Sequence, residues 1–171
     1  MKVALVHDWL VTHRGGENVL LEIARLFPDA PIFTLVHKPG SVDSELEARA
    51  IHTSFIQKLP GAPQRFRRYL PLFPRAIESF DLSDFDGIIS TSHCVAKGVV
   101  VGPNQFHLSY VHSPMRYIWD QLPHYLPGPK LLRPLLEPFA QFGTIPLRKW
   151  DTASSQRPTA LVANSQFVAQ R

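Results

Sequence analysis

The chain has little that would suit an oxidising or membrane-embedded setting. It contains one cysteine, Cys94, which excludes an internal disulfide. Its N-terminus shows no secretory signal, and no apolar run approaches the roughly 18 residues of a membrane span. We therefore expect a protein of the reducing cytoplasm.

Acidic residues are missing from two stretches, although the net charge is only +4. One lies between Glu47 and Glu78, and the other runs from Gln121 to Leu136. Local positive charge of this kind attracts anionic surfaces. The basic residues of the two stretches are Arg49, Lys58, Arg65, Arg67, Arg68, Arg75, Lys130 and Arg133.

Four of these arginines fall between residues 65 and 75 among aromatic and aliphatic residues. Basic amphipathic segments bind anionic membranes or acidic partners. A surface helix whose apolar stripe joins the core has the same pattern, so both interpretations remain open. No recognised nucleic-acid-binding module accompanies the charge, and we expect no nucleic-acid partner.

Short apolar runs alternate with amphipathic segments along the chain, whose 171 residues suit one domain. The pattern predicts strands at 2–7, 30–36, 50–52, 86–90, 99–101, 107–111 and 159–163. It predicts helical segments at 17–26, 64–75, 95–98, 117–126 and 131–157, interrupted by several of the sixteen prolines. Such alternation indicates the α/β class, with a Rossmann-like, doubly wound parallel sheet.

Unusual polar residues follow the predicted strands where each one ends. They are His7-Asp8, Ser90 to His93 with a predicted turn at 91–93, His112-Ser113 and Asn164-Ser165. Ligands of open parallel sheets bind beyond the carboxyl ends of the strands. The sequence therefore predicts a site at this edge.

A Gly15-Gly16-Glu17 turn follows the first strand and opens the first helix. Glycines let a ligand approach the backbone, and a helix N-terminus favours negative charge. A tight turn in which Glu17 offsets the helix dipole is an equal alternative. The dinucleotide fingerprint G-x-G-x-x-G and the phosphate loop G-x-x-x-x-G-K are both missing, so the turn does not indicate NAD or ATP.

His112 ends an apolar strand directly before Ser113-Pro114. A histidine there could exchange hydrogen bonds with a substrate hydroxyl, or it could simply brace the backbone. No H-x-x-x-H spacing is found, so we expect no metal site. Ser113 and Tyr117 have dehydrogenase spacing, but Gln121 replaces the required lysine, and no G-x-S-x-G hydrolase motif is present.

Several motifs occur in one order over nearly the whole chain. They are Val6-His7-Asp8-Trp9-Leu10 with Gly15-Gly16-Glu17, Ser90-Thr91-Ser92-His93 with Ala96-Lys97-Gly98, Tyr110 to Asp120 around His112, Trp150-Asp151, and Ala163 to Val168. In these motifs the sequence resembles the N-terminal half of GT-B glycosyltransferases of family 4, particularly bacterial mannosyl- and rhamnosyltransferase-like members.

The resemblance implies one half of a GT-B fold, the acceptor-side domain of a retaining enzyme that uses a GDP-, UDP- or dTDP-sugar without a required metal. It implies that His112 lies at the reacting centre and that Gly15, Gly16 and Glu17 lie near the donor diphosphate. The acceptor side of the cleft would hold Asp8, Ser92, His93, Ser113, Arg116, Asn164 and Ser165.

The family's nucleotide-sugar domain, with its paired glutamates, has no counterpart in residues 1–171, so we expect this chain alone to lack turnover. The implied acceptor is a glycan or lipid-linked glycan of bacterial surface polysaccharide synthesis. Arg65, Arg67, Arg68 and Arg75 would then contact an anionic membrane, placing the protein peripherally on the inner face of the plasma membrane. The alternative is a stand-alone lipid- or partner-binding module on the same fold.

Overall fold

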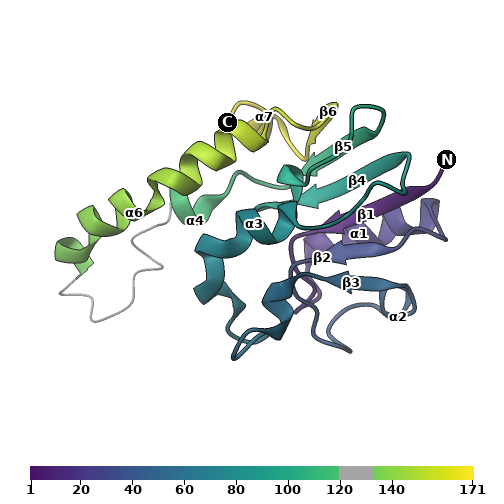
Figure 1. Cartoon of the computed structure of the whole chain (residues 1–171), viewed down its shortest axis with the longest axis horizontal. Helices are drawn as coiled ribbons and strands as arrows, with labels where there is room; N and C mark the ends of the chain where they lie inside the picture. The colour runs from purple at the N-terminus through teal and green to yellow at the C-terminus, as the bar shows by residue number, and fades with distance from the viewer. Residues whose placement is uncertain (120–132) are drawn as a thin grey trace.

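The computed structural model describes residues 1–119 and 133–171, without the side chains of Tyr117 and residues 133–142. Most of the predicted helix at 117–126 and of the second acid-free stretch lies outside these residues. A parallel sheet dominates the described part (Figure 1). Its strand order is β3-β2-β1-β4-β5-β6. The strands are β1 (Val3–His7), β2 (Ile32–Thr34), β3 (Ile51–Thr53), β4 (Gly87–Ser92), β5 (Phe106–Val111) and β6 (Ala160–Ala163).

All the strand pairs are parallel, which confirms the predicted α/β, Rossmann-like doubly wound sheet. The predicted strand at 99–101 is wrong, since no strand forms there. The predicted turn at 91–93 is also wrong in part, because β4 runs on to Ser92. Extended pairing with β5 uses the backbone groups of Thr91 and Ser92 in the ladder instead.

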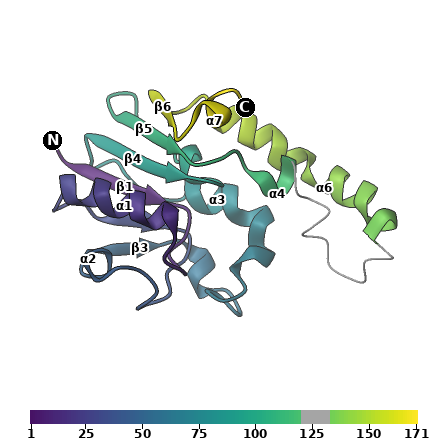
Figure 2. The same ribbon diagram turned by 180° about the vertical axis from the view of Figure 1, so that it is seen from behind.

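Side chains of β1 alternate between two cores, as a strand buried on both faces requires. Val3 and Leu5 pack with α1 (Gly15–Leu26), while Ala4 and Val6 join the core of the opposite face. The views from the two sides agree. Helix α1 lies before the sheet in Figure 2, and α3 (Phe73–Glu78) lies before it in Figure 1.

The α1 face is completed by a short helix that the sequence pattern missed, α2 (Ser44–Glu47). Arg49 follows it and donates hydrogen bonds to the carbonyl oxygens of Ala24, Phe27, Pro28 and Ala30. The carbonyls of Ala24 and Phe27 lie in the last turn and at the C-cap of α1, where a cation offsets the helix dipole, and the other two follow directly. Arg49 is therefore a helix cap and not part of a free basic surface.

The opposite face carries η1 (Phe55–Lys58), η2 (Phe66–Leu72) and α3. Proline decides how the predicted segment 64–75 folds. The chain forms a 3₁₀ helix through Pro71, and Pro74 occupies the first turn of α3, where its missing N–H costs nothing. Phe66 and Phe73 are buried in the core.

Helix α6 (Arg133–Ser154) is continuous and projects beyond the sheet in both views. Its C-terminal part packs on η3 (Ala96–Gly98). A Cβ atom at Gly98 would come within 2.5 Å of the Trp150 ring, so only glycine lets the two segments approach this closely. Lys97 forms a buried ion pair with Asp151 at the same contact. Two motifs far apart in the sequence, Lys97-Gly98 and Trp150-Asp151, are thus one packing unit.

Candidate functional site

The topological switch point of the sheet lies between β1 and β4. The chain leaves β1 toward β2 on one side and leaves β4 toward β5 on the other, which opens a crevice at the carboxyl ends. His7 ends β1, Ser92 ends β4, and His112 follows β5. The backbone N–H of His112 donates to the Ser92 carbonyl over 2.8 Å. The structure thus brings these three predicted strand ends together.

Asp8 follows β1 and is fully buried beside this crevice. Its Oδ2 accepts hydrogen bonds from the backbone N–H groups of His93 and Cys94, and its Oδ1 accepts those of Val95 and Ala96, all over 2.7–2.9 Å. The His93 ring Nδ1 lies 3.1 Å from Oδ2. Asp8 therefore binds the loop after β4 to the end of β1 and presents no surface to a ligand.

The electrostatic state of Asp8 follows from these contacts. Burial alone would raise the pKa of the carboxyl. The neighbouring His93 and His7 rings and the backbone N–H donors outweigh burial and hold the pKa below its ordinary value. Asp8 is consequently an anion throughout the neutral range.

Glu17 is buried in the first turn of α1. Its Oε2 accepts a hydrogen bond from the Arg14 backbone N–H over 2.9 Å, and Oε1 lies 3.8 Å from His7 Nε2. Burial acts to raise the Glu17 pKa, but the His7 ring and the Arg14 N–H outweigh it and lower the pKa. Glu17 is thus a capping carboxylate, as one of the two interpretations of the turn expects.

Gly15 and Gly16 occupy the start of α1, where the first backbone N–H groups of a helix have no intrahelical acceptor. A Cβ atom at Gly16 would lie 3.7 Å from both His112 Nε2 and His7 Cε1, whereas one at Gly15 would meet nothing within 4 Å. Gly16 therefore faces the two imidazoles directly. Gly15 faces open space.

Three histidine rings form one cluster around this turn, which we call the histidine cluster: His7, His93 and His112. The ring centroids of His93 lie 6.1 Å from His7 and 6.4 Å from His112. His7 Nδ1 is 2.6 Å from Thr91 Oγ1. Within the described residues, the buried Nε2 atoms of His7 and His112 make no hydrogen bond. His7 Nε2 has the Glu17 carboxylate 3.8 Å away, and His112 Nε2 lies beside Gly16 at the N-terminus of α1.

Burial, with the nearby His7 and His93 rings, lowers the pKa of His112 to about 4. Burial is also the main cause of a lowered pKa at His93. His112 is accordingly neutral at pH 7. A neutral imidazole can accept or donate a hydrogen bond at Nε2, depending on its tautomer.

The other predicted residues lie at the same edge of the sheet. Ser92 is buried, Ser113 is half-buried and Arg116 is exposed at the start of α4 (Arg116–Trp119). Asn164 follows β6 and is exposed. Ser165 caps α7 (Gln166–Ala169) by accepting the Val168 backbone N–H over 3.3 Å.

Trp9 lies in the candidate site but was not among the predicted site residues, and His7 was predicted at this edge without a role. The centroid of the Trp9 ring lies 4.4 Å from that of His93 and 4.9 Å from that of Phe66, and the Arg67 guanidinium lies 5.7 Å from the Trp9 ring. Trp9 thus connects the histidine cluster with η2. The signal for Trp9 was its position two residues after His7, directly beyond the end of β1.

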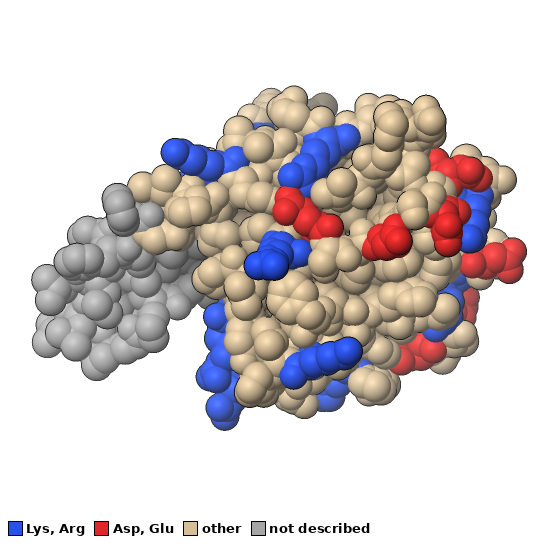
Figure 3. Space-filling view, viewed as in Figure 1, with Lys and Arg blue, Asp and Glu red and all other residues tan. Residues whose placement is uncertain are grey.

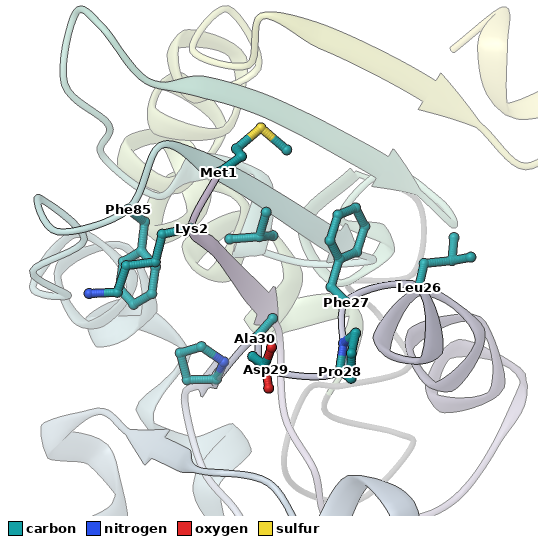
Figure 4. Close-up of a pocket in the computed structure, with 10 residues that line it drawn as sticks. Met1, Lys2, Leu26, Phe27, Pro28, Asp29, Ala30 and Phe85 are labelled. Carbon is teal, nitrogen blue, oxygen red and sulfur yellow. The ribbon is translucent and has the colours of Figure 1, made fainter.

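The described residues also form a shallow hollow of about 280 Å³ at the opposite edge of the sheet. Figure 4 shows its mostly apolar lining, with Phe27 and Pro28 beyond the end of α1 and Phe85 beside Lys2. It lies at the amino ends of the strands. Open parallel sheets bind their ligands at the other end, so we place the candidate site at the histidine cluster.

Comparison with known proteins identifies no relative of this chain. No family model, curated protein or solved structure matches the chain. Among the described residues, no group of three or more histidine, cysteine or acidic side chains could hold a metal ion. No helix in that part of the chain is long and apolar enough to cross a membrane.

Replacing the bracing carboxylate tests the role of Asp8. We expect Asp8→Asn to lower the free energy of unfolding by about 3 kcal/mol or more, because an amide cannot accept all four backbone N–H groups. Urea titration followed by circular dichroism measures the change. Asp29→Asn, at an exposed aspartate, is the control and should leave the free energy of unfolding unchanged. A loss of less than about 1 kcal/mol in Asp8→Asn would contradict this role.

The protonation state of His112 is open to direct measurement. We expect its ring resonances to titrate with a midpoint near 4 in the folded chain and near 6.5 in urea. Because the folded pKa is depressed, the neutral ring's contribution to stability is complete above pH 6.5 and is lost as the pH falls toward 4. A folded-state midpoint at or above 6.5 would contradict the buried, neutral imidazole.

Proposed function

We propose that this chain is the acceptor-side domain of a retaining glycosyltransferase that uses a nucleotide sugar. The observation that carries the proposal is the convergence of His112 Nε2 and His7 on Gly16 at the start of α1, at the switch point of a doubly wound sheet. The motif resemblance around the same residues supports it. Fold alone would leave the function open.

The start of α1 suits a phosphate group. Its free N–H groups and the helix dipole favour an anion, and the absent side chain at Gly16 lets the anion approach the backbone. The Glu17 carboxylate is partly compensated by the Arg14 N–H and the His7 ring, which it contacts. We assign this position to the donor diphosphate, with most of the nucleotide held by a second domain.

His112 then acts on the acceptor. In the proposed reaction the bond between the anomeric carbon and the diphosphate oxygen breaks, and a bond to the acceptor hydroxyl forms on the same face. The hydroxyl proton passes to the leaving phosphate oxygen. A neutral His112 can accept a hydrogen bond from that hydroxyl and orient it without taking the proton. Its lowered pKa suits positioning better than protonation.

An arginine surface beside the site supports a membrane-facing acceptor. Arg65, Arg67, Arg68 and Arg75 are exposed, and within the described residues none of them forms an ion pair. In Figure 3, Lys and Arg gather along the margin where η2 lies in Figure 1, while most Asp and Glu lie toward the opposite end. We propose that this surface contacts anionic headgroups, which suits a lipid-linked acceptor.

Nucleotide binding tests the diphosphate position. We expect GDP, UDP or dTDP to bind the chain weakly, with a Kd of about 1 mM, and to shift the amide resonances of Gly15, Gly16 and Glu17. Gly16→Val should abolish the shifts, because its side chain would fill the space before His7 and His112. Gly15→Val is the matched control, since nothing lies within 4 Å of that position.

Nucleotide binding at another surface, or equal binding by both valine variants, would contradict the assignment of the diphosphate to this position.

Sugar transfer is measured with the chain joined to a nucleotide-sugar domain. There His112→Ala should slow sugar transfer by about 100-fold, the scale of one well-placed catalytic group. Unchanged transfer would refute the place of His112, and a chain that binds vesicles but no nucleotide would favour the stand-alone lipid-binding module.

Vesicle flotation tests the arginine surface. We expect binding to phosphatidylglycerol vesicles that weakens with salt, and little binding to phosphatidylcholine. Replacing Arg65, Arg68 and Arg75 by Glu should weaken it by at least about a hundredfold, because the lost attraction alone is roughly 1 kcal/mol per arginine. Glu at exposed Lys2, Lys38 and Lys149 changes the net charge equally and should have a smaller effect. Equal loss in both triple variants would contradict a localised surface.

A further inference from the structure

A second cavity, of about 690 Å³, lies at the carboxyl ends of β5 and β6, and we call it the lateral cavity. Apolar walls come from the ends of these strands and from α7, including Val111, Leu161 and Val168. The wall formed by α6 is polar and includes Asp151, Thr152 and Ser155. This volume and the mixture of apolar walls with a few convergent polar groups are typical of small-molecule sites.

Its floor is a buried ion pair that α6 forms with η3. The Lys97 and Asp151 side chains are each only 8% exposed, and the Lys97 ammonium bonds Asp151 Oδ1. The Trp119 indole N–H donates to Asp151 Oδ2 over 2.7 Å. The two charges cancel, so the floor is polar but carries no net charge. Each carboxylate oxygen has a further lone pair for a donor from a ligand.

Trp119 adds an aromatic surface to the same cavity. The residue is 42% exposed even though its indole nitrogen is bonded to Asp151. The Arg148 guanidinium lies 5.2 Å from the centre of its ring and helps to fix it. A large exposed aromatic side chain held in one orientation is a ready contact for an apolar ligand face.

We infer that the lateral cavity is a subsite for an uncharged saccharide unit. A sugar ring pairs hydroxyl groups, which match Asp151, Thr152 and Ser155, with a C–H face that suits Trp119. The two cations of the lining are already in contact within the chain, Lys97 with Asp151 and Arg171 with the ring of Phe167, whose centre is 5.8 Å away. A phosphate would have to compete with these contacts for a cation, whereas a sugar hydroxyl needs no charged partner. A prenyl chain would leave the polar wall without partners, at the cost of desolvating it.

The location of the cavity gives this subsite a role within the proposed function, on which that role rests. Val111 and Pro114, on either side of His112 in the chain, both line the cavity. A glycan seated there would enter from the strand end that carries His112. The lateral cavity would then hold a sugar unit of the acceptor, which makes the acceptor a glycan and not a bare lipid alcohol.

Saturation-transfer NMR on the chain tests the subsite without any nucleotide. The probes are the methyl α-glycosides of D-mannose, L-rhamnose and D-glucose. We expect at least one of them to show saturation transfer and to shift the Trp119 indole N–H resonance. Leu161→Trp should weaken binding by about tenfold or more, because the larger side chain fills the cavity. Val162→Trp, on the other face of the same strand, is the matched control and should bind normally.

A second pair of variants tests the same cavity in case Leu161→Trp fails to fold. Thr152→Trp fills the cavity from the opposite wall, and Ala153→Trp, beside it but outside the lining, should be silent. No signal with any glycoside, or equal signals in filling and control variants, would overturn the subsite. Preferential binding of farnesol would overturn the saccharide assignment. GDP shifts at Gly16 are read separately, so this proposal can fail while the proposed function stands.

Discussion

One buried carboxylate organises the candidate site. Asp8 accepts four backbone N–H groups from the loop after β4 and contacts the His93 ring. A buried anion is tolerated only when such donors compensate its lost hydration. The same bonds join the end of β1 to the end of β4 and fix the two walls of the switch-point crevice. The positions of His7, Trp9 and His93 all depend on these hydrogen bonds.

The neutral His112 ring and the first turn of α1 lie side by side in this crevice. Burial keeps His112 uncharged, while the negative capping group, Glu17, accepts the Arg14 backbone N–H and faces His7. The crevice therefore offers backbone N–H groups and the uncharged His112 ring. That combination suits an anion and a hydroxyl held side by side, and it underlies the proposed transfer of sugar from phosphate to alcohol.

Much of the fold could be predicted from the sequence because buried parallel strands are short continuous apolar runs. The six strands and α1 all lie where such patterns indicated, within a few residues. The strand expected at 99–101 did not form, since a short apolar run does not distinguish a strand from a buried loop. Helix α2 is only four residues long and has no periodicity to detect. The strand-end rule also predicted that His7 and His112 lie at one edge of the sheet.

The sequence by itself determined the class of fold, the edge where the candidate site residues gather, and the chemistry of those residues, since these depend on local pattern and strand direction. Only the tertiary structure decided what each side chain does. In the structure, Asp8 binds the loop after β4, Arg49 caps α1, and Lys97-Gly98 packs against Trp150-Asp151. The reason is physical: hydrogen bonds and burial are set by neighbours distant in the chain. A sequence pattern shows which polar groups could bind a ligand, but not which of them already bond to other parts of the folded chain.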